Sequence, residues 1–329
     1  MAKIASSRKK KNRALEIYVE PEVSPDSSQG DLFLCDIANW PVKDDLASME
    51  IPLFSLSKSK DLRTREYTRG NKSVSIRPST DGAATVFDKD LLLYISSQII
   101  AALNEGNPIS KTVRINSSDF LQATCRSNGG NQYAQIINML RRLKGTTIET
   151  NIKTGGVQQA EGFGLIDKYQ VLASEKGKGK TNAKGEISEV EYVHEFTVTI
   201  SDWLFNGLKN FETLTLDRNY FLLSQSIERR LYEIAKKHCG DKAYWKINID
   251  LLAEKIGSSG PRHRLREDIK RSIKNDQIPD YKIGLDSKVK PDMVVFITRD
   301  SRKLHKELTQ SLDLLTWYQS LILTIPDKK

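Results

Sequence analysis

The segment Gly177–Thr181 resembles a known chemical motif, the phosphate-binding loop of nucleotide-binding proteins, because it reads Gly-Lys-Gly-Lys-Thr. That motif requires a glycine five positions before Gly179, and Ser174 stands there. The motif also leads into a helix whose first N–H groups hold the phosphates, whereas residues 190–200 are strand-like. The sequence therefore argues against nucleotide binding and predicts a flexible, basic hairpin loop.

Histidine and cysteine residues are too scattered to form a catalytic or metal-binding constellation. No pair has the spacing of zinc ligands, and the paired-histidine motif that a strand-nicking enzyme needs is missing. An odd number of distant cysteines fits a reducing cytoplasm better than a disulfide framework. We therefore expect a cytoplasmic protein without enzymatic activity, cofactor or metal. The residues concerned are His194, His238, His263, His305, Cys35, Cys125 and Cys239.

The formal net charge of +9 is concentrated in three stretches of the chain. Residues 1–15 hold six cations and no acid, residues 174–185 hold four lysines and one acid, and residues 260–274 hold six cations and two acids. Such local concentration is typical of surfaces that contact nucleic-acid phosphates. A charge run can equally be a solvated face or tail, so charge alone leaves both interpretations open.

The region 261–275 is predicted to be an amphipathic helix with Leu265, Ile269 and Ile273 on its buried face. Arginine forms paired hydrogen bonds with guanine in the major groove, and the start of a recognition helix usually reaches the bases. Cations in the first turn oppose the helix dipole, which favours a ligand-facing role over an exposed helix with charge pairs. The predicted DNA-binding residues of this helix are Arg262, Arg264, Arg266, Lys270 and Arg271.

A second amphipathic helix is predicted at residues 131–144. Its side chains Asn131, Gln132 and Gln135 are candidates to contact base edges, and Arg141 and Arg142 are candidates to hold phosphates. The helix dipole alone would also favour cations at this C-terminal end, so the alternative of a purely structural role stays open.

Three further candidates lie in the basic hairpin loop. Lys176, Lys178 and Lys180 are predicted to lie along the DNA backbone as part of a wing. Backbone contacts of this kind position a protein on DNA without distinguishing one base from another.

The elements that would position these residues occur twice in the same order. Each set has a helix, a strand, a short helix, a second helix and a hairpin, which is the winged-helix arrangement. Ser117 or Ser118 is expected to cap the first short helix, and Asp250 the second. The first set is expected at 88–106, 112–115, 119–123, 131–144, 164–172 and 190–200, and the second at 217–238, 244–249, 251–256, 261–275, 281–285 and 293–297.

The predicted fold class is therefore α+β, with two tandem winged-helix domains and a flexible basic N-terminal arm. A chain of 329 residues is long enough for two domains. We expect the arm at residues 1–30, the first domain with an N-terminal connector at 31–215, and the second domain with a C-terminal helix, 302–323, at 216–329. Additional strands are expected at 72–77, 83–87 and 146–152. No apolar run approaches the ~20 residues that span a bilayer, so no membrane partner is expected.

Several long blocks of the sequence resemble one family, the plasmid replication initiators called replication initiator protein A. The blocks are residues 42–61, 73–106, 139–152, 227–240, 245–258 and 278–281, including IERRLYEIAKKHCG and WKINIDLLAEKIGS. Residues 1–15 and the helix after Arg302 lie outside them.

This resemblance implies a bacterial protein that binds repeated double-stranded DNA sites at a plasmid origin. It also implies self-association between monomer and dimer, and recruitment of host replication initiator and helicase proteins. A transcriptional repressor with the same winged-helix fold and no replication activity is the alternative.

Overall fold

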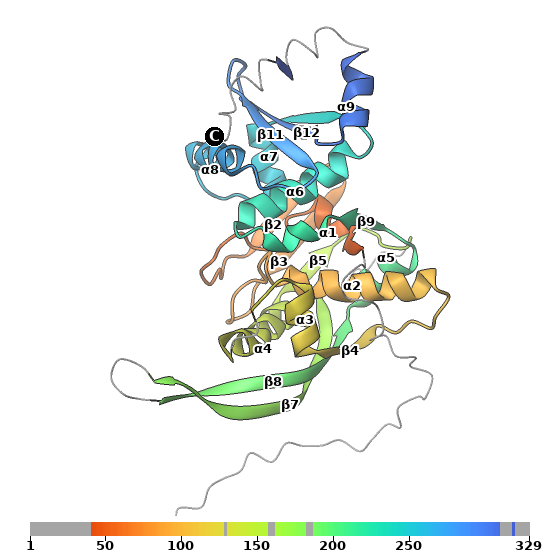
Figure 1. The fold of residues 1–329 in the computed structure, drawn as a ribbon, viewed down its shortest axis with the longest axis vertical. Helices are drawn as coiled ribbons and strands as arrows, with labels where there is room; N and C mark the ends of the chain where they lie inside the picture. Colours follow the sequence, from red (N-terminus) through yellow and green to blue (C-terminus); the bar gives the residue numbers. More distant parts are fainter. Residues whose placement is uncertain (1–40, 128–129, 157–161, 182–186, 310–317, 320–329) are drawn as a thin grey trace, which may run out of the picture.

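The structure is a computed structural model that describes residues 41–127, 130–156, 162–181, 187–309 and 318–319. The predicted arm and residues 31–40 of the predicted connector lie outside these ranges. The described part combines helices with antiparallel sheets, which confirms the predicted α+β class (Figure 1). None of the described helices combines the length and the apolar composition needed to cross a membrane.

The predicted order of elements is present in both halves of the molecule. In each half the strand before the short helix pairs with the last strand of the hairpin, giving the sheets β4-β8-β7 and β10-β12-β11. The first half has α2 Lys89–Asn104, β4 Thr112–Asn116, α3 Ser117–Ala123, α4 Gly130–Gly145, β7 Ile166–Thr181 and β8 Ile187–Ile200. The second has α6 Ser226–Cys239, β10 Tyr244–Asn248, α7 Ile249–Ile256, α8 Arg262–Asn275, β11 Tyr281–Asp286 and β12 Met293–Thr298.

The two short helices are capped by asparagines at equivalent positions. Asn116, the last residue of β4, accepts the N–H of Ser118 at 2.9 Å. Asn248, the last residue of β10, accepts the N–H of Leu251 at 2.7 Å. The predicted caps at Ser117 or Ser118 and at Asp250 were wrong, because each strand runs directly into its helix and the cap is the final strand residue.

A four-stranded sheet in the first half lies outside this repeated pattern. It contains β2 Arg65–Arg69, β3 Lys72–Arg77, β5 Thr147–Thr150 and β6 Phe163–Gly164 in that order. The strands predicted at 72–77 and 146–152 are confirmed as β3 and β5, and the buried side chains of Ile76 and Ile148 face each other across the pair. The strand predicted at 83–87 was wrong: this region makes only one isolated bridge, from Thr85 to Ser55.

The described start of the chain packs into the second half. The strand β1 Val42–Asp45 pairs with β9 Thr213–Leu216, and the short helix α1 Leu46–Glu50 follows β1. The side chains of Val42 and Met49 belong to the core of the second half, together with Leu93 of α2. The chain therefore passes from the core of the second half to that of the first between Met49 and Ile51, and returns to the second between Leu208 and Leu216. The expected domain boundary of 215/216 falls in β9.

The helix predicted at residues 217–238 begins later than expected. After β9 a short 3-10 helix, η1 Arg218–Leu222, precedes α6, and the side chain of Asp217 caps it. Arg229 of α6 donates to the carbonyls of Phe221 and Leu223 at 3.0 and 2.8 Å, so a side chain of α6 satisfies these carbonyls in place of the backbone N–H groups of a continuous helix. The prediction of one continuous helix from residue 217 was therefore wrong: η1 ends at Leu222 and α6 begins at Ser226.

The C-terminal helix is described only in part. The helix α9 Ser301–Leu308 begins where the sequence predicted, with the side chain of Asp300 accepting the N–H of Arg302 at 2.9 Å. Leu304 and Tyr318 cover Val295 and Ile297 on the outer face of the second sheet. Residues 310–317 and 320–323 of the predicted helix lie outside the described ranges.

Candidate nucleic-acid interface

The helix α8 is held in place by its apolar stripe and by a tight turn before it. Leu265 and Ile269 are buried, at 2% and 0% exposure. The turn from α7 begins at Gly257, whose φ of +74° is left-handed. A Cβ there would lie 2.7 Å from Cβ of Pro52 and 3.0 Å from Oη of Tyr67, so only glycine fits against the first half.

The cations of α8 lie on its outer side, and most of them face a carboxylate. Arg262 pairs with Asp250 at 2.9 Å across exposed surface. Lys270 and Arg271 pair with Glu267 and Asp268, each one turn earlier on the helix itself. Such exposed pairs contribute about 0–1 kcal/mol each, so these three cations can exchange their carboxylates for another anion at little cost.

Arg266 and Arg264 differ sharply in their surroundings. Arg266 Nε lies 2.6 Å from Oδ2 of Asp292, whose side chain is only 1% exposed. Hydrogen bonds from Arg266 and Lys290 lower the pKa of Asp292 to about 2. Arg264 is exposed, and no carboxylate of the described residues forms an ion pair with it. The structure therefore ties Arg266 to the hairpin and leaves Arg264 exposed, without an ion pair to any described carboxylate.

The helix α4 shows the same contrast between a held and an open arginine. Arg142 binds Asp88 through two hydrogen bonds, from Nε at 2.8 Å and Nη2 at 2.7 Å, and these bonds raise the pKa of Arg142. It thus joins α4 to the start of α2. Arg141 and Gln135 are exposed, and Gln132 is half-buried. The phosphate contact predicted for Arg142 stays a prediction, and forming it would require breaking the pair with Asp88.

The remaining predicted residues are placed by their backbone alone. Lys176 and Lys178 lie in β7 opposite Glu191 and Glu189 of β8, and Lys180 lies near the end of β7. The side chains of these lysines and of Asn131 are not among those described. The segment predicted to be a flexible loop is in large part the end of a long hairpin that projects from the body (Figure 1).

The candidate elements are on one side of the molecule. Figure 1 shows α8, α4 and the end of the β7–β8 hairpin toward the left, with β2 between the two helices.

A buried ionic network joins the two halves that carry these elements. Lys89 at the start of α2 lies 2.7 Å from Asp44 of β1 and 3.1 Å from Glu233 of α6. All three side chains are at most 2% exposed.

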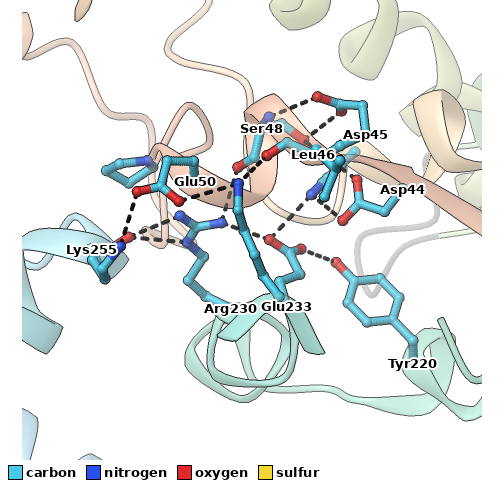
Figure 2. Close-up of polar contacts among 12 residues, drawn as sticks. Asp44, Asp45, Leu46, Ser48, Glu50, Tyr220, Arg230, Glu233 and Lys255 are labelled. Atoms are coloured by element: carbon cyan, nitrogen blue, oxygen red, sulfur yellow. Dashed lines mark hydrogen bonds and ion pairs between the residues drawn. The ribbon is translucent and has the colours of Figure 1, made fainter. Parts of the chain in front are cut away.

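Glu233 is the centre of this network, as Figure 2 shows. Tyr220 donates to its Oε1 at 2.7 Å and Arg230 to its Oε2 at 2.9 Å. Arg230 also donates to the carbonyls of Ser48 and Lys255. Burial favours the neutral carboxyl, but Lys89 and Arg230 outweigh it and lower the pKa of Glu233. At Asp44 burial prevails and raises the pKa to about 7. Because each buried charge has a partner, the network resists separation of the halves.

A second set of ion pairs lies beside the first. Asp90 of α2 binds Arg229 of α6 and, at 2.8 Å, Arg126 from the segment after α3. Sequence reasoning missed both sets. The signal available was the position of Lys89 and Asp90 directly before the apolar stretch of α2; Arg229 and Glu233 lie among other charged residues of α6 and give no such signal. No group of three or more potential metal ligands gathers in the part of the chain that the structure describes.

Solved structures with a similar fold belong to the protein RctB. A crystal structure of domains 2 and 3 of RctB aligns with a TM-score of 0.53 and 12% identity, covering 77% of this chain and 96% of that one. A second structure of RctB domains 2–3 aligns with a TM-score of 0.50 and 14% identity, covering 77% and 97%. Because the sequence identity is this low, the likeness to RctB shows a similar fold only.

The sequence comparisons define the family. The family model of replication initiator protein A matches residues 43–283. A protein of Wigglesworthia glossinidia brevipalpis, described as a candidate replication protein, is 37% identical over 250 residues, covering 75% of this chain and 86% of that protein. The chain therefore belongs to the replication initiator protein A family, and the resemblance expected from the sequence blocks is confirmed.

Proposed function

We propose that this protein is a plasmid replication initiator without enzymatic activity, which binds repeated double-stranded DNA sites at the plasmid origin. In this proposal each half is a winged-helix unit, with α4 and α8 as recognition helices and the β7–β8 and β11–β12 hairpins as wings. The repeated element order and the repeated strand order of the two sheets support the assignment. The two-domain RctB structures, whose chains are almost fully covered, support the division into two units.

One observation carries the proposal: α4 and α8 lie on the same side of a body whose halves are joined by a buried ionic network (Figure 1). Two recognition helices on a rigid body can enter successive major grooves of one duplex. Exposed Arg264 and Gln135 are the side chains we assign to base contact. The lysines of β7 and Arg141 are assigned to phosphates.

The proposal extends to partners and location. As an initiator of this family, the protein would work in the bacterial cytoplasm, interconvert between monomer and dimer, and recruit host replication initiator and helicase proteins. Family membership supports these expectations.

Gel-shift titration of the DNA adjoining the gene tests the proposal. We expect binding to repeat-bearing duplex that weakens steeply as salt rises, since phosphate contacts release counterions. Equal binding to scrambled duplex of the same length and composition would contradict it.

Two further assays separate the alternatives. Replication of an otherwise inert plasmid that carries the repeats distinguishes an initiator from a repressor with the same fold. Neither ATP hydrolysis nor strand cleavage is expected, with or without Mg²⁺, and turnover in either assay would contradict the non-enzymatic assignment.

A further inference from the structure

Residues 57–64, here called the bridging segment, lie between the two candidate recognition helices. The segment reads Ser-Leu-Ser-Lys-Ser-Lys-Asp-Leu-Arg-Thr from residue 55 and leads into β2, which Figure 1 shows between α8 and α4. Its cations Lys58, Lys60 and Arg63 are all exposed.

One end of the bridging segment contacts the turn that precedes α8. Arg63 donates from Nη1 to Oγ of Ser259, in the α7–α8 turn, at 2.7 Å. The same guanidinium binds the buried carboxylate of Asp61 from Nε at 2.9 Å and from Nη2 at 3.1 Å. These bonds fix the direction of Arg63, while its side chain stays 62% exposed.

The middle of the segment is connected to the end of α4. The carbonyl of Asp61 accepts the N–H of Ala83 at 2.8 Å. A Cβ on Gly82 would lie 3.0 Å from Cγ of Lys60, so the segment packs against this turn. Ser79 of the same turn contacts the last residue of α4, because a Cβ on Gly145 would lie 2.4 Å from Oγ of Ser79. A continuous series of contacts thus runs from α8 to α4.

A groove separates the bridging segment from α8. It has a volume of about 430 Å³, and Arg63 and Arg264 both line it. Ser57, Ser258 and Ser259 also line it. Its three carboxylates have partners: Asp61 binds Arg63, Asp268 binds Arg271 and Glu228 accepts from Asn275. Arginine and serine side chains are groups that proteins use to bind nucleic-acid phosphates.

The lysines of the segment are available to a ligand. Among the described residues, no carboxylate forms an ion pair with Lys58 or Lys60. A duplex held by α4 and α8 must pass in front of the element between them, and its two backbones carry one charge per ~1.7 Å of axis. An anionic partner of this density complements three exposed cations in a short segment.

We propose that the bridging segment is a third DNA contact, in which Lys58, Lys60 and Arg63 bind phosphates between the two major grooves that α4 and α8 enter. This inference rests on the proposed function and specifies a surface that joins the two units on one duplex. Because the ligand is the phosphate backbone, the contact adds affinity without base preference.

The test is the double variant Lys58→Ala/Lys60→Ala, which leaves the Arg63–Asp61 pair intact. The matched control is Arg302→Ala/Lys306→Ala, which removes two exposed cations from α9, on the other side of the second unit (Figure 1). Both are titrated between 50 and 200 mM salt against duplex DNA adjoining the gene and against scrambled duplex. Circular dichroism melting checks that both variants remain folded.

We expect the bridge variant to bind both duplexes at least ~10-fold more weakly at about 0.1 M salt, and its salt slope to fall in magnitude by about 2. The ratio of affinities for the two duplexes should not change, and the control should bind as wild type does. In ethylation interference, the variant should lose sensitivity only at phosphates between the two groove contacts.

Three results would overturn the inference in distinguishable ways. A bridge variant with wild-type affinity and slope, while Arg264→Ala is impaired, would reject the third contact and leave the proposed function standing. A wild-type protein that binds both duplexes equally would reject the proposed function itself. A changed affinity ratio with an unchanged slope would show base contact in place of phosphate contact and would also reject the inference.

Discussion

The helices α4 and α8 occupy equivalent places in the two halves, yet they are anchored at opposite ends. Arg142 in the last turn of α4 binds Asp88 at the start of α2, whereas Arg266 near the start of α8 binds Asp292 just before β12. The open residues differ accordingly: α4 exposes Gln135 and Arg141, and α8 exposes Arg264. Local charge alone therefore does not identify a DNA contact, because each helix uses one arginine to fix its own position.

The two three-stranded sheets also differ in the polarity of their outer faces. In the first half this face carries Thr197, Thr199 and Glu195 of β8, which are half-buried and polar. In the second half it carries Val295 and Ile297, buried beneath α9. The same arrangement of strands thus stands open in one unit and needs a covering helix in the other.

The largest effect should come from the network that joins the halves. Replacing Lys89 by Met leaves Asp44 and Glu233 buried together without their shared cation. We expect a loss of about 3–5 kcal/mol in the free energy of unfolding, measured in urea. Hydrogen exchange should show faster exchange in both α2 and α6, since the network belongs to both halves. Lys306→Met serves as the exposed control, and a loss below ~1 kcal/mol for Lys89→Met would contradict the coupling of the halves.

The next effect separates the two arginines of α8. Arg264→Ala should weaken binding to the repeat-bearing duplex by about 1–3 kcal/mol and relax its preference over scrambled DNA, with no change in melting temperature. Arg266→Ala should instead lower the free energy of unfolding, because it leaves buried Asp292 without its main partner. Gel-shift titration and urea unfolding of both variants make the comparison. If Arg266→Ala impairs only binding, the anchoring role assigned to it is incorrect.

A smaller effect should distinguish the two sheets. Leu304→Ala removes the aliphatic side chain that covers Val295 and Ile297, and because Leu304 is itself only partly buried we expect a loss of about 1–2 kcal/mol. Thr197→Ala, on the polar face of the first sheet, should change stability by less than ~0.5 kcal/mol. Urea unfolding measures both. Equal losses would show that α9 is not needed to cover the second sheet.

The smallest effect should be the pH dependence of the α8 anchor. The pKa of Asp292 is lowered from 3.8 to about 2 in the folded protein, so its pairing stabilises the fold above pH 4 and is lost as the pH falls through 2. Wild type should therefore exceed Asp292→Asn by about 1 kcal/mol at pH 6, a difference that shrinks between pH 4 and pH 2. Thermal melts at several pH values measure it. A difference that grows on acidification would contradict the pairing.

Much of the fold could be predicted from the sequence, because apolar periodicity in the helices is locally encoded. The stripes of Leu265 with Ile269 and of Ile136 with Leu140 mark α8 and α4 correctly, and the second hairpin was placed within a residue. The caps were missed since Asn116 and Asn248 end strands and cap helices at once. The late start of α6 was missed because Arg229 binds carbonyls that a longer helix would have used.

The candidate site could be predicted only in part. The positions of cations on α8 follow from spacing along one helix. Their partners do not, because Asp292 approaches Arg266 from another strand and Asp88 approaches Arg142 from another helix. The bridging segment has no periodicity, and its place between α4 and α8 depends on contacts with Gly82 and Ser259 that are distant in the chain.

The pairing of β1 with β9 has a consequence for how the chain is made. Lys43 of β1 bonds to Thr215 of β9, 172 residues further along. At ~5–20 residues per second, the ribosome delivers this partner on the order of 10 to 30 seconds after β1 emerges. During that interval Val42 and Met49 have no core to enter, and the edge of β1 is open to other strands. A nascent chain stopped before residue 216 should therefore depend on chaperones, whereas the finished chain closes both halves together.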